Sequence, residues 1–403
     1  MKRPELLAPA GNLEKLKIAC IYGADAVFLG GQSYGLRSNS DNFTLDDIIE
    51  GVKFANRYNT SVYVTTNIYA HSENLIGFEE YVIALQAAGV RGIIVSDPAY
   101  IEITKKSAPG LEIHISTQQS ITNKYAVNYY EKQGVDRVVL ARELTFAEIK
   151  EITDNCETEV EVFIHGAVCS SYSGRCTLSN HMTLRDSNRG GCCQSCRWDY
   201  QLSTKVDGQL VPNALNHDYN FTMSAKDMSM LAFIPQMCSL GVDSFKIEGR
   251  MKSFHYLATV VNVYRTALDS YFEDPENYQV KEEWINELKK AESRETYEGA
   301  LIGDLGSKGQ IFDDQYKPKQ VEYAGYVLDY DQTSGYALVE ERNHFKVGDT
   351  LEFFGPHSQV FKQVITEIID DEGNRIERAN KPLMQVKLKV DRPVAKHWLV
   401  RKG

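Results

Sequence analysis

Short apolar runs alternate with helix-length segments over the first part of the chain. The apolar runs, which are rich in β-branched residues, lie at 4–8, 26–30, 61–65, 92–96, 112–116, 137–140, 160–164 and 244–248. The segments between them include helix-length stretches at 13–22, 44–58, 78–88 and 146–153. Strands that alternate with helices predict a parallel sheet. Eight such units over about 250 residues predict a closed (β/α)8 TIM-like barrel. An open doubly wound sheet is the alternative.

A long insertion at 166–243 separates the seventh predicted strand from the eighth. It holds a cluster of cysteines and a turn-like segment at 206–209. Active sites of such barrels are built where the strands end, so an insertion of this length there is typical of a functional element. After the eighth strand, 253–271 and 283–295 predict two helices.

The hydrophobic period changes to two from about residue 320 onward. Alternating runs lie at 322–327, 336–340, 349–354, 362–365 and 384–388, with turn signals such as 371–374 between them. This pattern predicts a small C-terminal antiparallel β-barrel. We therefore expect two domains: a TIM-like barrel with its insertion at 1–310, and a small β-barrel at 311–403.

Composition indicates a water-soluble globular protein, with 43% hydrophobic and 25% charged residues among 403. No apolar run approaches the roughly 18 to 20 residues of a membrane span, and no signal-peptide core follows the first residues. A cytoplasmic location is expected. The net charge is −11, yet residues 374–403 carry nine basic and two acidic side chains. The basic C-terminal end suits a phosphate-rich partner better than the acidic remainder does.

Five of the eight cysteines are concentrated in the insertion. They are Cys169, Cys176, Cys192, Cys193 and Cys196. Such clustering in a cytosolic chain is more typical of metal or redox chemistry than of disulfides. Only the last two have the C-x2-C spacing that zinc sites favour, so an iron-sulfur cluster is preferred over zinc. Inert buried cysteines and a thioredoxin-like redox pair are weaker hypotheses for the same residues.

Several charged residues are expected at the same mouth of the barrel. Lys246, Glu248 and Arg250 alternate along and after the eighth strand, so all three are expected to point inward. Arg37, Arg189 and Arg197 lie in loops predicted near them, and clustered guanidinium groups suit a carboxylate or phosphate ligand. A solvated salt-bridge ladder is the alternative for the strand residues.

Two further residue patterns bear on catalysis. His165 ends a predicted strand, where it is either a proton carrier or a packing residue. The segment 31–35 matches the G-x-S-x-G pattern of serine hydrolases, but so short a match is common by chance. The metalloprotease pattern H-E-x-x-H does not occur.

The chain also contains an ordered set of longer motifs. One runs from Glu161 through Phe163, Gly166 and Cys169 to Gly174-Arg175-Cys176. The others are at 5–11, 116–118, 188–192, 196–198, 226–227 and 246–252. With these motifs the chain resembles the peptidase U32 family, also called collagenase-like peptidases, from about residue 4 to 252 and on into the C-terminal domain.

This resemblance implies RNA hydroxylation more than proteolysis. Characterised members carry a 4Fe-4S cluster on four cysteines, and Cys169, Cys176 and Cys192 match three of them directly. Cys196 is the best fourth ligand, because it completes the C-x3-C spacing before Arg197-Trp198. One branch hydroxylates the wobble uridine of the tRNA anticodon to 5-hydroxyuridine, with prephenate as co-substrate and without oxygen. Other branches act on a ribosomal RNA cytidine or a small aromatic ubiquinone precursor. Some relatives place a further cysteine where this chain has Ser229, and the additional Cys193 is an alternative ligand.

Roles for the remaining candidates follow from this resemblance. Prephenate carries two carboxylates, for which the expected binding residues are Arg37, Gln118, Arg189, Arg197, Lys246 and Arg250. Glu248 and His165 are the expected proton-transfer residues. A peptidase acting on collagen-like substrates and a nonenzymatic RNA-binding accessory remain alternatives. Oligomeric state does not follow from the sequence.

Overall fold

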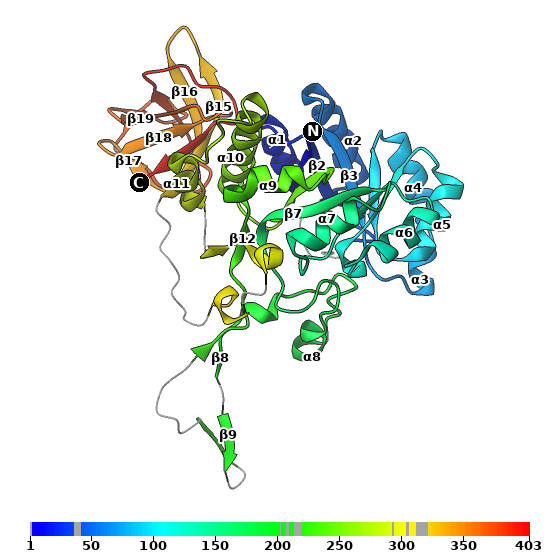
Figure 1. Ribbon diagram of the computed structural model, residues 1–403. Helices are drawn as coiled ribbons and strands as arrows, with labels where there is room; N and C mark the ends of the chain where they lie inside the picture. Colours follow the sequence, from blue (N-terminus) through cyan, green and yellow to red (C-terminus); the bar gives the residue numbers. More distant parts are fainter. Residues whose placement is uncertain are drawn as a thin grey trace. The chain divides into compact units, whose positions relative to one another are not determined.

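The computed structural model describes residues 2–35, 42–201, 203–206, 209–212, 220–291, 294–303, 306–311 and 321–403, with backbone alone at 201–221. Two compact units divide the chain (Figure 1). The first comprises residues 1–16, 25–251 and 294–317, and the second comprises 17–24, 252–293 and 318–403. The functional boundary expected at residue 310 stays a prediction.

The first unit is built on a closed parallel barrel. Its strands are β1 (Glu5–Ala10), β2 (Ala26–Gly30), β3 (Ser61–Thr66), β4 (Gly92–Val95), β5 (Glu112–Ile115), β6 (Arg137–Val139), β7 (Glu159–Ala167) and β13 (Ser244–Ile247). Each strand pairs with the next, and β13 closes the ring by pairing with both β7 and β1. The prediction of an eight-stranded TIM-like barrel is therefore confirmed, and the open sheet is wrong.

Helices follow most of the barrel strands. They are α1 (Leu13–Ile21), α2 (Leu45–Ala55), α3 (Ser72–Leu75), α4 (Phe78–Ala87), α5 (Pro98–Ser107), α6 (Lys124–Lys132), α7 (Phe146–Thr153) and α9 (Ile234–Ser239). Capping boxes begin α2 and α7, where Thr44 pairs with Asp47 and Thr145 with Glu148. Because helices cover the outside and side chains fill the inside, strands such as β2 are buried along their whole length.

The barrel interior is layered. Leu7, Ala26, Phe28, Tyr63 and Ile94 form a buried apolar cluster inside the barrel. These residues come from strands β1 to β4, and alternate positions of each strand point inward. The interior is thus a packed core, and a ligand has room only at its end.

The insertion after β7 contains short elements. They are α8 (Leu178–Thr183), a 3-10 turn at Ser195–Arg197, β8 (Tyr200–Gln201), β9 (Ser203–Val206), β10 (Gln209–Pro212), β11 (Asn220–Phe221) and β12 (Asp227–Ser229). Strand β7 is longer than its neighbours, and its end pairs antiparallel with β12, which pairs with β14 (Thr296–Tyr297). The insertion therefore starts and ends on the rim of the barrel.

The second unit combines two helices with an antiparallel sheet. The helices are α10 (Phe254–Glu273) and α11 (Glu282–Ala291). The eight-stranded sheet has the order β19 (Val360–Val364), β18 (Thr350–Phe354), β24 (Leu399–Lys402), β15 (Glu322–Asp331), β16 (Tyr336–Glu341), β23 (Gln385–Lys389), β20 (Ile368–Ile369) and β21 (Arg375–Ile376). Strands β17 (Phe345–Lys346) and β22 (Arg378–Ala379) form a separate pair. The alternating pattern predicted this antiparallel domain, which resembles a half-barrel.

In the part of the chain that the structure describes, no helix combines the length and apolar character needed to cross a membrane.

Candidate active site

A cavity of about 240 Å³ lies in the first unit, where barrel strands end. Its walls come from residues after β5, β6 and β13 and from the insertion that follows β7. Hydroxyl and amide side chains line much of it: Thr65, Asn67, Ser116, Thr117, Gln118, Ser170, Ser171, Ser173, Ser187, Asn188 and Gln194. A pocket in this position, with polar groups placed along its walls, is where enzymes of this architecture bind their substrates.

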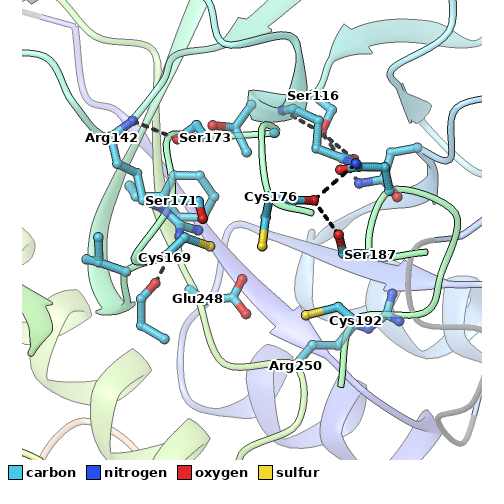
Figure 2. Close-up of a pocket in the computed structure, with 18 of the residues that line it drawn as sticks. Ser116, Arg142, Cys169, Ser171, Ser173, Cys176, Ser187, Cys192, Glu248 and Arg250 are labelled. Carbon is cyan, nitrogen blue, oxygen red and sulfur yellow. Dashed lines mark hydrogen bonds between the residues drawn. The ribbon is translucent and has the colours of Figure 1, made fainter. Parts of the chain in front are cut away.

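Four cysteines line this pocket. They are Cys169, Cys176, Cys192 and Cys196, the set predicted as cluster ligands. Figure 2 shows the sulfur atoms of Cys169, Cys176 and Cys192 around a common space with the Glu248 carboxylate. Residues distant in the sequence are thus gathered on one surface.

Cys193 is held in a different environment. It is absent from the pocket lining, and its sulfur lies 3.4 Å from the Ser179 hydroxyl and 3.5 Å from that of Thr183. Desolvation raises the pKa of the Cys193 thiol, but hydrogen bonds with Ser179, Thr183 and Ser195 lower it to about 7. By contrast, desolvation raises the pKa of the Cys196 thiol more than Arg197 lowers it. Cys192 therefore lines the pocket, whereas the sulfur of its neighbour Cys193 lies among hydroxyl groups outside the lining.

Short-range contacts fix the cysteine loops. The carbonyl of Cys176 accepts hydrogen bonds from the Ser187 hydroxyl and, at 3.2 Å, from the Asn188 amide (Figure 2). Ser187 and Asn188 belong to the segment that leads to Cys192, so the two cysteine segments are tied together. Gly174 packs so closely on Gln118 that a Cβ there would lie 2.0 Å from the Gln118 carbonyl oxygen.

Positive charge predominates among the ionisable side chains of the lining, apart from the thiols. Arg142, Arg197, Lys246 and Arg250 contribute cations, and Glu248 is the one carboxylate among the described lining residues. The Arg250 guanidinium lies 3.4 Å from the Thr65 hydroxyl. The Arg142 guanidinium donates to the Ala167 carbonyl at 2.9 Å and stacks 3.8 Å from the centre of the Phe163 ring. Such a surface suits an anionic ligand.

Beneath the pocket, Lys246 enters a buried ion-pair network. Its ammonium lies 2.7 Å from the Glu161 carboxylate, which also lies 3.2 Å from the guanidinium of Arg137. Burial raises the pKa of Glu161, but Lys246, Arg137 and His114 together hold it well below its usual range, at about 2. Glu161 is therefore ionised inside the barrel.

The other predicted site residues differ in whether they line the pocket. Gln118 lines the pocket and its side-chain oxygen accepts from the Ser96 hydroxyl at 3.1 Å. Arg189 is not a lining residue; its guanidinium pairs with Glu73 at 2.8 Å. His165 is buried on β7 and is also absent from the lining. Arg37 lies outside the described residues. The proposed roles of all these residues stay predictions.

Sequence reasoning missed two contributors. Arg142 follows strand β6, so the rule that functional side chains lie after barrel strands points to it. Glu161 begins the motif that runs to Cys176, but no sequence pattern identifies Lys246 as its partner. That pairing depends on the parallel register of β7 and β13, which places Ser244 opposite Glu161 and Lys246 two residues further along, opposite Phe163.

A single metal ion has no ready site in the described part of the chain. No group of three or more His, Cys, Asp or Glu side chains there is arranged to hold one. Zinc needs four ligands converging on one point at about 2.3 Å from sulfur. Four of the cysteines line one cavity.

Two family models match the chain. Residues 11–310 match peptidase family U32, and residues 319–401 match the peptidase family U32 C-terminal domain.

Three curated proteins illustrate the range of similar sequences. The Bacillus subtilis tRNA hydroxylation protein P1 is 52% identical over 402 residues, covering 100% of this chain and 95% of that protein. The Escherichia coli 23S rRNA 5-hydroxycytidine C2501 synthase is 38% identical over 272 residues, covering 68% and 40%. A Porphyromonas gingivalis collagenase is 30% identical over 390 residues, covering 94% and 92%.

Proposed function

Because this chain belongs to peptidase family U32, and is similar over its whole length to a tRNA hydroxylation protein, we propose that it hydroxylates tRNA. The expected product is 5-hydroxyuridine at the wobble position of the anticodon, and the expected place of action is the cytoplasm. One observation of the site carries the proposal: four cysteines and four cations line a single pocket at the end of the barrel.

The cysteines fit a 4Fe-4S cluster by their chemistry. In such a cluster each thiolate binds a different iron atom, so the four ligands surround a volume rather than a point. Cys169, Cys176, Cys192 and Cys196 all line one cavity, which supports a cluster held among them. We assign these four as the ligands. When bound, the cluster supplies redox or Lewis-acid chemistry at the pocket.

The cationic lining suits prephenate as the co-substrate. Prephenate carries two carboxylates, and each is best recognised by a guanidinium or ammonium group with fixed geometry. Lys246 and Arg250 reach the pocket from the end of β13, and Arg197 and Arg142 from other segments. The cations are held from different elements, so they can bind the two carboxylates separately.

Glu248 is the better of the two predicted proton carriers. It is the one carboxylate among the described lining residues, whereas His165 is buried and absent from the lining. A group that transfers a proton must come within hydrogen-bond reach of the reacting atom. We therefore assign proton transfer to Glu248.

The RNA substrate must present one base to this pocket. Enzymes that modify a base extrude it from its stack and often bind it against aromatic side chains. Tyr172, between Cys169 and Cys176, and Trp198, just after Cys196, are 50% and 43% exposed and are available for such stacking. In the second unit, exposed cations such as Lys387, Arg392 and Lys396 supply phosphate contacts.

Nucleoside mass spectrometry of tRNA tests the proposal. A strain lacking this gene and any paralogue of it is compared with the same strain complemented by the wild-type chain or by Cys169→Ser. We expect 5-hydroxyuridine and its derivatives to disappear in the deletion strain, to return with the wild-type chain and to remain absent with Cys169→Ser. Unchanged 5-hydroxyuridine in the deletion strain would refute the proposal.

A peptidase activity is the competing function, because a collagenase is among the similar proteins. The same purified chain, freed of metal, is incubated with gelatin. Cleavage by this protein, together with unchanged tRNA in the deletion strain, would establish the peptidase instead. Loss of 23S rRNA hydroxycytidine in place of tRNA hydroxyuridine would shift the substrate to ribosomal RNA.

A further inference from the structure

Glu161 is a buried acid that the proposed chemistry does not use. Its side chain is fully buried, and it is absent from the lining of the pocket. It nevertheless lies 2.7 Å from Lys246, which does line the pocket. Glu161 can therefore act on a ligand in the pocket through Lys246, which pairs with Glu161 and lines the pocket.

Lys246 needs a counterion where it lies. Its ammonium is 4.5 Å from the centre of the Phe28 ring and 5.5 Å from that of Phe163, and its side chain is 6% exposed. The rings attract the cation, but they do not replace the water that burial removes. A carboxylate at hydrogen-bond distance does so, and removing it leaves an uncompensated buried charge.

The network behind Glu161 fixes the direction of this carboxylate. Its second oxygen lies 3.2 Å from the guanidinium of Arg137, which also pairs with Glu5 at 2.6 Å and Glu159 at 2.7 Å. The buried His114 is a further group whose electrostatic interaction with Glu161 lowers the pKa of this carboxyl group. With one oxygen held by Arg137, the other is left directed at Lys246.

We propose that Glu161 is a positioning residue, which holds the Lys246 ammonium at the floor of the pocket so that it binds a carboxylate of the small-molecule ligand. The identity of that ligand rests on the proposed function. Arg137 neutralises the remaining charge of Glu161, and Phe28 and Phe163 keep water from the ammonium. Two motifs distant in the sequence, 161–176 and 246–252, are thereby joined by one ion pair.

A purely structural role in the barrel core is the competing explanation. Glu159 provides the control, because it sits on the same strand and pairs with the same arginine, but its side chain is 41% exposed and its second cation is Lys2 rather than Lys246. If Glu161 merely balances Arg137, then neither Glu161→Gln nor Glu159→Gln alters the reactivity of Lys246, even where their effects on stability differ. If Glu161 positions Lys246, only Glu161→Gln alters the behaviour of that lysine.

The first measurement is the rate at which Lys246 reacts with acetic anhydride at fixed pH, measured by peptide mass spectrometry. We expect Glu161→Gln to raise this rate about tenfold or more, because the amine loses the carboxylate that holds it as a buried, unreactive ammonium. Glu159→Gln should leave the rate within about twofold of wild type. Equal rates in all three proteins would overturn the proposal. This readout needs neither RNA nor an iron-sulfur cluster, so it stands even if the tRNA assay fails.

The second measurement separates ligand binding from turnover in the holoenzyme. With prephenate as the varied substrate, Glu161→Gln should raise KM by about tenfold or more while kcat falls much less, because Lys246 is a binding group. In a Lys246→Met background the same substitution should have little further effect on KM. Full additivity of the two substitutions would contradict the positioning role.

If Glu161→Gln does not fold, Glu161→Asp takes its place. Aspartate keeps the charge beside Arg137 but withdraws the carboxylate from Lys246 by one methylene. We expect the same direction of change in the acetylation rate and in KM, and wild-type values for both would refute the proposal.

Discussion

Arg401 donates a hydrogen bond to the carboxylate of Glu352 at 3.0 Å inside the second unit, and its side chain has no exposed surface. The same guanidinium pairs with Glu287 and donates to the hydroxyl of Thr259 at 2.7 Å. Lys402, the next residue, pairs with Asp349 at 2.9 Å. Part of the basic C-terminal stretch is therefore structural, although the sequence alone suggested that all of it faces phosphates.

Replacing Arg401 should destabilise the second unit. In Arg401→Met, Glu352 keeps Lys290 at 2.9 Å but loses its most buried partner, so we expect a loss of about 3 kcal/mol in unfolding free energy. Urea unfolding, with hydrogen exchange at the amides of β24, measures this loss. The control Lys387→Gln changes an exposed residue of β23 and should stay within about 0.5 kcal/mol of wild type. A similar loss of unfolding free energy in both variants would contradict the structural role assigned to Arg401.

The exposed cations of the same unit should govern the salt dependence of tRNA binding. Replacing Lys387 and Lys396 by Gln should weaken binding and reduce the slope of log K against log salt by about 1 for each phosphate that is no longer neutralised. Filter binding over a salt series measures the slope. Lys150→Gln removes a cation that already pairs with Asp154 on α7, and it should leave the slope unchanged. If the double variant matches wild type, the phosphate-binding residues lie elsewhere.

The pocket cysteines should differ sharply from their neighbour Cys193. Replacing Cys169, Cys176, Cys192 or Cys196 by Ser should remove most of the roughly four irons per chain expected of the anaerobically purified protein. Cys193→Ser should retain iron and the brown absorbance, because this sulfur is absent from the pocket lining and contacts Ser179 instead. Iron analysis and absorption spectra measure both. Loss of iron in Cys193→Ser but not in Cys192→Ser would exchange the two assignments.

Gly174 should be essential for the shape of the cysteine loop. Its φ is +73°, and an added Cβ would lie 2.0 Å from the backbone oxygen of Gln118. Gly174→Ala should therefore displace the loop and greatly reduce iron content. Gly303→Ala also forces a positive φ, of +121°, but its Cβ meets no atom of the described residues within 4 Å. The backbone there, with ψ of 179°, is in a region essentially restricted to glycine, so we expect the control to lose about 1 to 3 kcal/mol from strain with iron content unchanged. Equal iron content in both variants would argue against this packing.

Acid should weaken the barrel partly through Glu112. Burial raises the pKa of Glu112, but His114 and Arg91 lower it from 4.5 to about 2. A carboxyl group whose pKa is depressed by folding contributes stability above its unfolded pKa, and that stability is lost as the pH falls from about 4.5 toward 2. Glu112→Gln should therefore cost on the order of 2 kcal/mol at about pH 6 and less than about half of that at about pH 3.

Urea unfolding at the two pH values measures this difference. The exposed Glu102 on α5 provides the control, and Glu102→Gln should differ from wild type equally at both. A Glu112→Gln effect that does not change with pH would refute the link.

Local patterns were sufficient to predict the elements of this protein. The alternation of apolar runs with helix-length segments gave eight strands in barrel order, and the change to a period of two gave the antiparallel domain. Those patterns depend only on residues close together in the sequence, because burial of one face or both faces of an element sets the spacing of its hydrophobic positions. The cysteine-rich insertion and four of its cysteines were likewise evident from their spacing and motifs.

Tertiary structure alone decided which side chains meet. It brought Arg142 into the pocket, turned Arg189 toward Glu73, buried Arg401 and joined Glu161 to Lys246. These outcomes depend on strand register, on closure of the barrel and on how loops pack, which connect residues far apart in the chain. A sequence therefore determines the strands and helices by local burial, whereas the chemistry of this pocket depends on contacts that exist only when the barrel is closed.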